Sequence, residues 1–269
     1  MITHPLLPKL RQLKLSGMLQ TLDLRAVFAN CAHDYQCGEA QLAKQAQERG
    51  LNPVEFFSLL IEDELERRNQ QRHSRRLAQS GCDPAKTLAH FDFNAAVGVN
   101  RTLIQELATC AFVARHENVL FCGATGLGKS HLANALACEA LRRDYRVLSR
   151  TTQRLLTELQ AARANGTYSR HFARLLGVDL LLLDDFGLHP LTPQAVQDLY
   201  ELISERYERG SLLITSNRAF EEWAELFAND LLASAALDRL THHAHIMVFR
   251  GQSYRQRSRR NEVPNPTAE

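Results

Sequence analysis

One stretch of sequence decides the fold of this chain, namely Gly123-Ala124-Thr125-Gly126-Leu127-Gly128-Lys129-Ser130. It matches the Walker A pattern of two glycines separated by four residues and followed by Lys-Ser. The glycines let the backbone curl so that N–H groups point at phosphate oxygens, and a helix beginning at Lys129 adds its dipole. Lys129 supplies a charge for the β- and γ-phosphates, and Ser130 a hydroxyl ligand for Mg²⁺. We expect a nucleotide-binding loop that includes the adjacent His131.

The segments around this loop predict an α/β domain with a parallel sheet and flanking helices. Residues 178–183 form an apolar run that only Asp179 interrupts and that two further acids follow, which is typical of a strand buried on both faces. Thr192-Pro193 opens a helix that Gly210 closes, with an apolar face formed by Val196, Leu199, Ile203 and Tyr207. The other predicted elements are strands at 118–122, 147–148 and 211–215 and a helix at 129–141.

Acidic and amide side chains follow two of these strands. Asp184 and Asp185 end the apolar run, in the manner of a Walker B motif. Asp184 would hold Mg²⁺, usually through water, and Asp185 could orient and deprotonate an attacking water. Asn217 follows the next strand and could reach the γ-phosphate, although an asparagine at a strand end is usually a turn or cap residue. Because no guanine-reading Asn-Lys-x-Asp motif occurs, ATP is favoured over GTP.

The chain is expected to have two domains. Residues 1–80 show helical spacing and predict a helical N-terminal domain. Residues 81–95 are expected to form a linker that packs its aromatic residues on the next domain. Residues 96–260 are expected to form the ATPase domain, and residues 261–269 a disordered tail. One helix is signalled clearly by Asn52 as N-cap, Pro53 at the first helical position and Glu55 completing a capping box.

Charge is unevenly distributed, although the net charge is only +2. Two arginine clusters are either solvated faces or contacts to DNA phosphates: the DNA-binding candidates Arg67, Arg68, Arg72, Arg75 and Arg76, and a second group, Arg250, Arg255, Arg257, Arg259 and Arg260. The six cysteines show no CxxC pair, which favours free thiols, and a partial metal site at Cys31, His33 and Cys37 lacks a fourth ligand nearby. With no signal sequence or membrane span, we expect a cytoplasmic protein.

Several short motifs are distributed over residues of roughly 8 to 260. They are the Walker A loop, Leu-Leu-Leu-Leu-Asp-Asp-Phe-Gly (180–187), Ile-Thr-Ser-Asn-Arg (214–218), Leu-Asp-Arg-Leu (237–240), Arg-Gly-Gln-Ser-Tyr-Arg (250–255), Leu-Lys-Leu-Ser-Gly-Met (13–18) and Glu-Asp-Glu-Leu-Glu-Arg-Arg (62–68). Together they resemble the IstB family, ATPases encoded beside an insertion-sequence transposase and related to the DnaC helicase loaders.

This resemblance implies an AAA+ core that assembles with copies of itself. Asn217 would be sensor 1, Arg239 an arginine finger that reaches a neighbouring subunit's ATP, and Arg255 a candidate sensor 2. The implied cofactors are ATP and Mg²⁺, and the implied partners are a transposase and double-stranded DNA, bound largely without regard to sequence and away from any membrane. Asp185 stands where AAA+ proteins usually have glutamate, and only thirty residues follow Arg239, which leaves little room for a helical lid.

Three functions are therefore considered. The favoured one is an ATPase that assembles on target DNA with ATP, assists a transposase and is reset by hydrolysis. The alternative is a DnaC-like loader of a replicative helicase. The third is a small-molecule phosphotransferase, which ranks last because Asp185 and Asn217 suit water activation better than an organic acceptor.

Overall fold

The computed structural model describes residues 53–93, 99–227, 229–251 and 253. The predictions for the motif at 13–18, the cysteines near residue 31, Arg255 and the tail at 261–269 lie outside the described residues. The chain divides into two compact units, Met1–Ser74 and Arg75–Glu269. Helix α5 (Pro53–Ser80) begins at the proline predicted for the first helical position.

The second unit is built on a five-stranded parallel sheet with strand order β2-β3-β4-β1-β5. Its strands are β1 (Asn118–Gly123), β2 (Val147–Thr151), β3 (Leu180–Phe186), β4 (Ser211–Ser216) and β5 (Ala244–Phe249). Since all strands run in the same direction, their carboxyl ends meet at one edge of the sheet.

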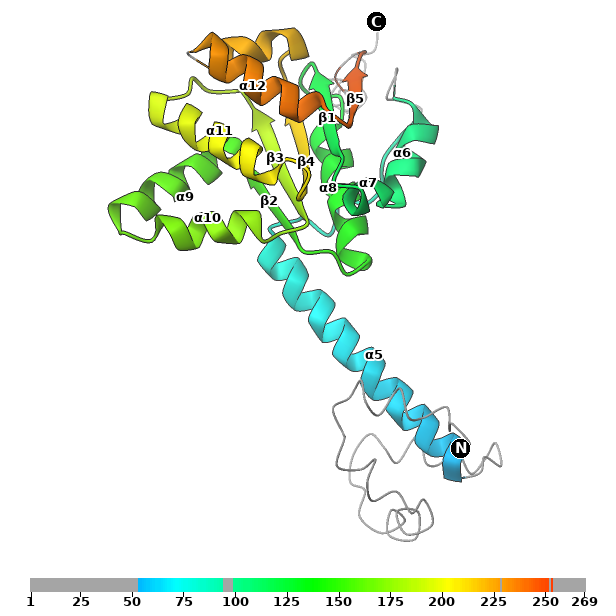
Figure 1. Ribbon diagram of the computed structural model, residues 1–269. Coiled ribbons are helices and arrows are strands. Elements are labelled where there is room, and N and C mark those ends of the chain that lie inside the picture. The colour runs from blue at the N-terminus through cyan, green and yellow to red at the C-terminus, as the bar shows by residue number, and fades with distance from the viewer. Residues whose placement is uncertain (1–52, 94–98, 228, 252, 254–269) are drawn as a thin grey trace, which may run out of the picture. The chain divides into compact units, whose positions relative to one another are not determined.

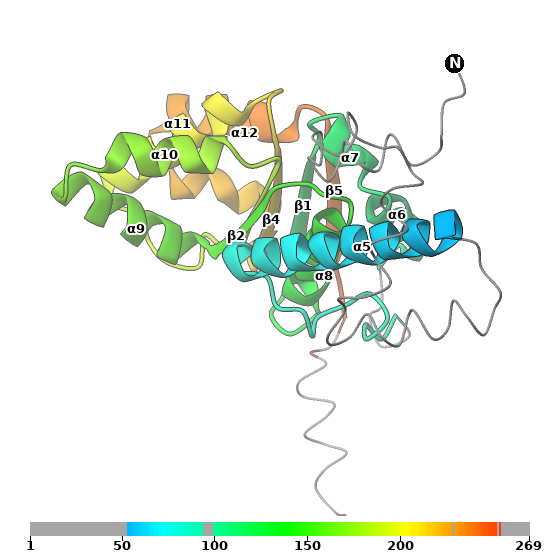
Figure 2. The same ribbon diagram turned by 90° about the horizontal axis from the view of Figure 1, so that it is seen from below.

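Helices cover both faces of this sheet, as Figures 1 and 2 show. One layer contains α6 (Arg101–Ala108), α7 (Ala111–Ala114) and α8 (Lys129–Arg142). The other contains α9 (Thr152–Ala164), α10 (Tyr168–Leu176), α11 (Pro193–Arg206), the 3-10 helix η1 (Phe220–Leu226) and α12 (Asp230–Thr241). Each layer encloses its own hydrophobic core against the sheet.

Strand β3 shows why its sequence is apolar throughout. Leu180 and Leu182 enter the core beneath α8, whereas Leu181 and Leu183 enter the core beneath α9 to α12. Successive side chains of a strand point to opposite faces, so a strand covered on both sides has no solvent-facing position.

The predicted elements near the loop agree with the structure to within a few residues. Helix α11 begins at Pro193, and the Thr192 side chain caps it by accepting from the Ala195 N–H at 3.2 Å. Two boundaries differ: β3 begins two residues later than predicted and continues through the two aspartates to Phe186, and α11 ends at Arg206, before the predicted Gly210. The sequence reading did not identify α6, α7, α9, α10, α12 or β5.

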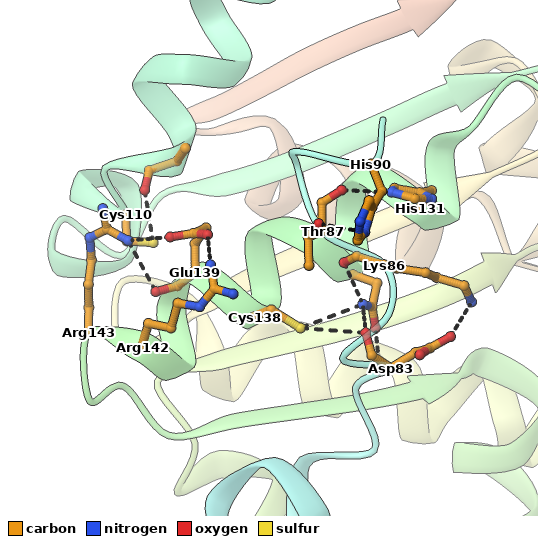
Figure 3. A network of polar contacts seen from close by, with 12 residues as sticks. Asp83, Lys86, Thr87, His90, Cys110, His131, Cys138, Glu139, Arg142 and Arg143 are labelled. Atoms are coloured by element: carbon orange, nitrogen blue, oxygen red, sulfur yellow. Dashed lines mark hydrogen bonds and ion pairs between the residues drawn. The ribbon is translucent and has the colours of Figure 1, made fainter. Parts of the chain in front are cut away.

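The segment that follows α5 is packed on α8, as Figure 3 shows. Asp83 and Asn134 are joined twice, because the Asp83 N–H donates to Asn134 Oδ1 at 2.9 Å and Asn134 Nδ2 donates to the Asp83 carbonyl at 2.7 Å. Phe91 and Phe93 pack against the same core with ring centroids 4.9 Å apart. This segment therefore rests on the helix that follows the glycine-rich loop.

Among the described residues, no helix combines the length and the apolar character that crossing a membrane requires.

Candidate functional site

The glycine-rich loop connects the carboxyl end of β1 to the first turn of α8. Gly126 and Gly128 have φ angles of 84° and 88°, in the left-handed region that favours glycine. A Cβ atom at Gly128 would also lie 2.5 Å from Phe91 Cε2, so the aromatic residue packs directly on the loop. The loop therefore has the curled backbone predicted for it, with Ser253 against Gly126.

Lys129 is the buried cation of this site, with 5% of its surface exposed. Its ammonium group donates to the carbonyls of Gly123 at 2.7 Å and Ala124 at 2.8 Å and to Asn217 Oδ1 at 2.9 Å. Burial lowers the pKa of Lys129, and the charges of Asp185 and Asp184 oppose that shift. All three ammonium hydrogens thus have acceptors. One acceptor, Asn217 Oδ1, belongs to the loop that follows the neighbouring strand β4.

Asp184 lies at the centre of a cluster of hydroxyl groups. Its Oδ1 accepts a hydrogen bond from Ser130 Oγ at 2.7 Å and another from Thr215 Oγ1. The same Thr215 hydroxyl accepts from the Asp185 N–H at 3.2 Å. The Asp184 carbonyl in turn accepts from Thr152 Oγ1 at 3.1 Å. Hydroxyls from α8, β4 and α9 therefore hold the first aspartate in position.

A bulge in β3 sets the positions of the two aspartates. Leu183 pairs with Ile214 and Phe186 with Ser216, so Asp184 and Asp185 together stand opposite the single residue Thr215. Asp185 has a φ of 55°, which is uncommon for a residue with a side chain. Phe186 rather than Asp185 then fills the core beneath α9 to α12. The extra residue thus keeps the Asp185 carboxylate out of this apolar core.

The loop after β4 is braced against the loop after β3. Ser216 Oγ donates to the Phe186 carbonyl at 2.7 Å, and Arg218 Nε donates to the Gly187 carbonyl at 2.8 Å. These bonds connect the two segments that carry the aspartates and Asn217. The half-buried Asn217 is thereby brought to the Lys129 ammonium group.

His131 faces the segment that precedes the domain. Its Nε2 is 2.8 Å from the carbonyl of Thr87, and Figure 3 shows both residues. Its ring centroid lies 5.6 Å from that of Phe91. The imidazole therefore joins the loop helix to residues 87–91. A role of His131 in nucleotide binding stays a prediction, which is supported only by the position of this residue beside the loop.

Arg239 lies at the opposite edge of the sheet from the glycine-rich loop. Asn118, the first residue of β1, donates from Nδ2 to the Leu240 carbonyl at 3.0 Å. A strand of this length spans about 16 Å, and the loop begins at its other end. The Arg239 guanidinium donates to the Ala235 carbonyl at 2.8 Å and lies 5.7 Å from the Tyr200 ring centroid. It is not brought to the Lys129 site of its own chain.

The predicted DNA-binding arginines fall into two groups. Arg67 and Arg68 both donate to the Glu64 carboxylate, at 2.7 Å and 2.6 Å, and these bonds lower the pKa of Glu64 to about 2. Arg76 forms an ion pair with Asp144. Arg72 and Arg75 are exposed, and within the described part of the chain neither has an ion pair.

The sequence reading missed two hydroxyl residues at this site, Thr215 and Thr152. Thr215 is 1% exposed and contacts both aspartate residues. The sequence did contain a signal for Thr215, namely a polar residue near the end of a strand whose central residues are apolar. Such a residue needs a hydrogen-bonding partner when it is buried. Thr152 had no comparable signal, since a threonine at a helix start is ordinarily a cap.

The assembled site can bind a polyphosphate and a hard cation. A buried ammonium group and a helix amino terminus suit phosphate oxygens, and oxygen ligands from a hydroxyl and a carboxylate suit a divalent ion such as Mg²⁺. Ser130 Oγ and Asp184 Oδ1, at 2.7 Å, are close enough to share one ion, which would replace the hydrogen bond between them.

Comparison with known proteins gives consistent results for sequence and fold. Residues 33–262 match the family described as IstB-like ATP binding protein. A Pseudomonas aeruginosa protein named as the ATP-binding protein of insertion sequence IS21 is 37% identical, over 81% of this chain and 83% of that protein. A Sinorhizobium fredii protein named as an insertion-sequence ATP-binding protein is 34% identical, over 97% of this chain and 99% of that one.

Among solved structures, the crystal structure of DnaI is similar, with a TM-score of 0.54 and 22% identity over 61% of this chain and 90% of that chain. At this identity the likeness concerns the fold. The predicted α/β fold with an AAA+ P-loop core is thereby confirmed. The predicted helical domain before residue 53 lies outside the described residues.

Proposed function

This chain belongs to the IstB-like ATP binding protein family, and from that premise we propose that it binds and hydrolyses ATP at residues 123–130. The observation that carries the proposal is the position of Lys129, which is buried and bonded to Asn217 from the neighbouring strand. A buried ammonium group is costly unless it has strong acceptors. Phosphate oxygens are stronger acceptors than the two loop carbonyls that it now contacts.

Nucleotide binding would exchange one set of Lys129 contacts for another. The carbonyls of Gly123 and Ala124 would be released, and the N–H groups of the loop would turn to the phosphates. The contact with Asn217 can persist through this exchange, because it comes from outside the loop. Asn217 would then lie beside the terminal phosphate, where it can hydrogen-bond to an oxygen or to water.

Mg²⁺ would be held by Ser130 and, directly or through water, by Asp184. The chemistry supplied there is neutralisation of phosphate charge. Thr215 would then orient the Asp184 carboxylate, because its hydroxyl already donates to that group. Asp185 would orient the attacking water and accept its proton, from the position that the bulge gives it.

Hydrolysis would also require a second copy of the chain. Because Arg239 lies at the far edge of the sheet, its guanidinium would act on the ATP of a neighbouring subunit. An arginine supplied in this way is worth about 10³ to 10⁵ in rate. Hydrolysis would thereby depend on assembly.

The biological role proposed is assistance to an insertion-sequence transposase, through ATP-dependent assembly on target DNA. It is supported by relatives named for insertion sequences and by the exposed Arg72 and Arg75 on α5. Arginine contacts to phosphates are independent of sequence and weaken steeply with salt. The double variant Arg72→Ala, Arg75→Ala should lose two phosphate contacts. The negative slope of log affinity against log salt should therefore become shallower by about 1.8.

The central test is calorimetric titration of the full chain with ATP and Mg²⁺. The wild-type protein should bind one ATP per chain, and Lys129→Ala should weaken binding at least about 100-fold. Lys86→Ala removes an exposed lysine outside the loop and should bind as wild type does. Absence of ATP uptake by the folded wild-type protein would disprove the proposal. If ATP binds and the protein also captures a replicative helicase but no transposase, the DnaC-like role is correct instead.

A further inference from the structure

A second cluster of ligand-type side chains lies at the amino edge of the sheet, away from the loop. It contains Glu208, just after α11, and the consecutive residues His242 and His243, just after α12. One ligand atom from each lies within 4.8 Å of the other two. The three residues are exposed and line a pocket together with Tyr207 and Arg239.

We propose that Glu208, His242 and His243 form a binding site for Zn²⁺ or a similar transition-metal ion. Two imidazole nitrogens and one carboxylate oxygen are a ligand set that Zn²⁺ accepts, with a fourth position left for water. Mg²⁺ and Ca²⁺ prefer oxygen ligands throughout, so this site differs in chemistry from the Ser130 and Asp184 pair.

The neighbouring groups are arranged to hold these ligands. The Tyr207 hydroxyl oxygen is 2.7 Å from His242 Nδ1 and accepts a hydrogen bond when that nitrogen carries the imidazole proton, which leaves the lone pair of Nε2 available for a metal. A hydroxyl contact of this kind orients a metal-binding imidazole in the same way as a carboxylate or carbonyl does.

The backbone at the cluster is held in an unusual conformation. Glu208 and His243 each have a φ of 57°, in the left-handed region that residues with a side chain seldom adopt. The His243 carbonyl accepts from the Asn118 N–H at 3.1 Å, and the His242 N–H donates to the Asp238 carbonyl at 2.9 Å. These bonds keep the two imidazole rings together, with centroids 3.9 Å apart.

Of the three arginines that line this pocket, one has its charge offset by a carboxylate, whereas two donate to neutral carbonyls and keep their charge. Arg115 donates to Glu117 at 2.7 Å, and Arg206 donates to backbone carbonyls within the domain. Arg239 donates to the Ala235 carbonyl. The Glu208 carboxylate is therefore the group of this pocket whose charge suits a metal ion.

Calorimetric titration with Zn²⁺ tests the site in the full chain, without nucleotide or Mg²⁺. We expect one Zn²⁺ per chain, and binding at least tenfold weaker in His242→Ala and in Glu208→Gln. His189→Ala removes an exposed histidine elsewhere in the domain and should bind as wild type does. Circular dichroism of each variant confirms folding. Failure of the wild type to bind, or equal binding by His242→Ala and wild type, would overturn the proposal.

Co²⁺ gives an independent readout of the ligand set. Visible absorption without a near-ultraviolet thiolate-to-metal band is expected, because no cysteine belongs to the cluster. A strong thiolate band that persists in His242→Ala would place the metal on cysteines and would overturn the assignment.

Zn²⁺ would also affect catalysis, a consequence that rests on the proposed function. A cation beside Arg239 would disfavour the approach of that guanidinium to a neighbour's ATP site, so Zn²⁺ should lower the ATPase rate of the wild type severalfold and leave Glu208→Gln unaffected. Zn²⁺ binding without this inhibition would keep the metal site and disprove its coupling to Arg239. Lack of ATP binding would concern the proposed function alone.

Discussion

The two edges of the sheet each hold a buried cation, in contrasting environments. At the carboxyl edge, Lys129 is 5% exposed and bonded to two loop carbonyls and the Asn217 side chain. At the amino edge, Arg206 is 1% exposed and donates to the carbonyls of Leu175, Val178, Asp179 and Ser211. Burial lowers the pKa of both, that of Arg206 to about 10.

The contrast indicates which buried charge is structural and which is functional. The partners of Arg206 belong to α10, β4 and the residues before β3, all of which the domain needs in place. Two partners of Lys129 belong to a glycine-rich loop that can turn its carbonyls away. A cation with exchangeable acceptors can bind a ligand, whereas one with permanent acceptors holds the fold together.

The largest effect on the ATPase rate is expected at Arg239, which would contact the ATP bound at the carboxyl edge of the sheet in a neighbouring chain. Arg239→Ala should lower the ATPase rate of the assembled protein by about 10³ to 10⁵. ATP affinity, measured by calorimetry, should stay as in the wild type, because the variant retains its own Lys129 site.

A mixing experiment provides the control. Arg239→Ala retains the loop and Lys129→Ala retains the arginine, so mixed assemblies should regain part of the ATPase rate that each variant lacks alone. Mixtures no more active than the separate variants would contradict a role of Arg239 between subunits.

The next largest effect is expected at Arg206. Arg206→Met keeps much of the side-chain volume but leaves buried carbonyls without donors, and should lower the free energy of unfolding by about 4 kcal/mol. Denaturant titration measures this change. Lys129→Met should cost far less stability, and an equal loss in the two variants would remove the distinction between the two cations.

A smaller effect is expected at Thr215. Thr215→Val removes the hydroxyl that contacts Asp184 and the Asp185 N–H, at nearly constant volume. The loss of one buried hydrogen-bonding group, about 1 to 3 kcal/mol, should appear as a 10- to 100-fold lower kcat. Steady-state kinetics test this, and Thr215→Ser should recover most of the activity because it restores the hydroxyl.

The smallest effect concerns backbone strain at Asp185. Residue 185 has a φ of 55°, which glycine adopts more easily than alanine. The free energy of unfolding of Asp185→Gly should therefore be about 1 kcal/mol higher than that of Asp185→Ala, despite the greater entropy of glycine in the unfolded chain. Thermal melting compares the two variants, both of which lack the carboxylate. A more stable alanine variant would show that the left-handed conformation is not maintained in solution.

Local patterns predicted the elements whose sequences are distinctive over a short window. Strands β1, β3 and β4 each contain an uninterrupted run of three or four apolar residues, α8 follows a glycine-rich loop, and α11 follows a Thr-Pro cap. Edge strand β5 was missed although its residues 246–249 form an apolar run, and at the edge of the sheet Ile246 and Val248 remain 43% and 48% exposed. Helices such as α9 and α12 are amphipathic, and their caps resemble ordinary loop residues.

The sequence by itself determined the residue types of the site, because phosphate and metal chemistry require glycines, a lysine, a hydroxyl and carboxylates at set spacings. Only the tertiary structure decided how they meet. The contact between Lys129 and Asn217 and the position of Thr215 opposite the two aspartates depend on strand order and register. So does the approach of Glu208 to His242 and His243. Strand order and register arise from packing between residues far apart in the chain, which no local sequence pattern records.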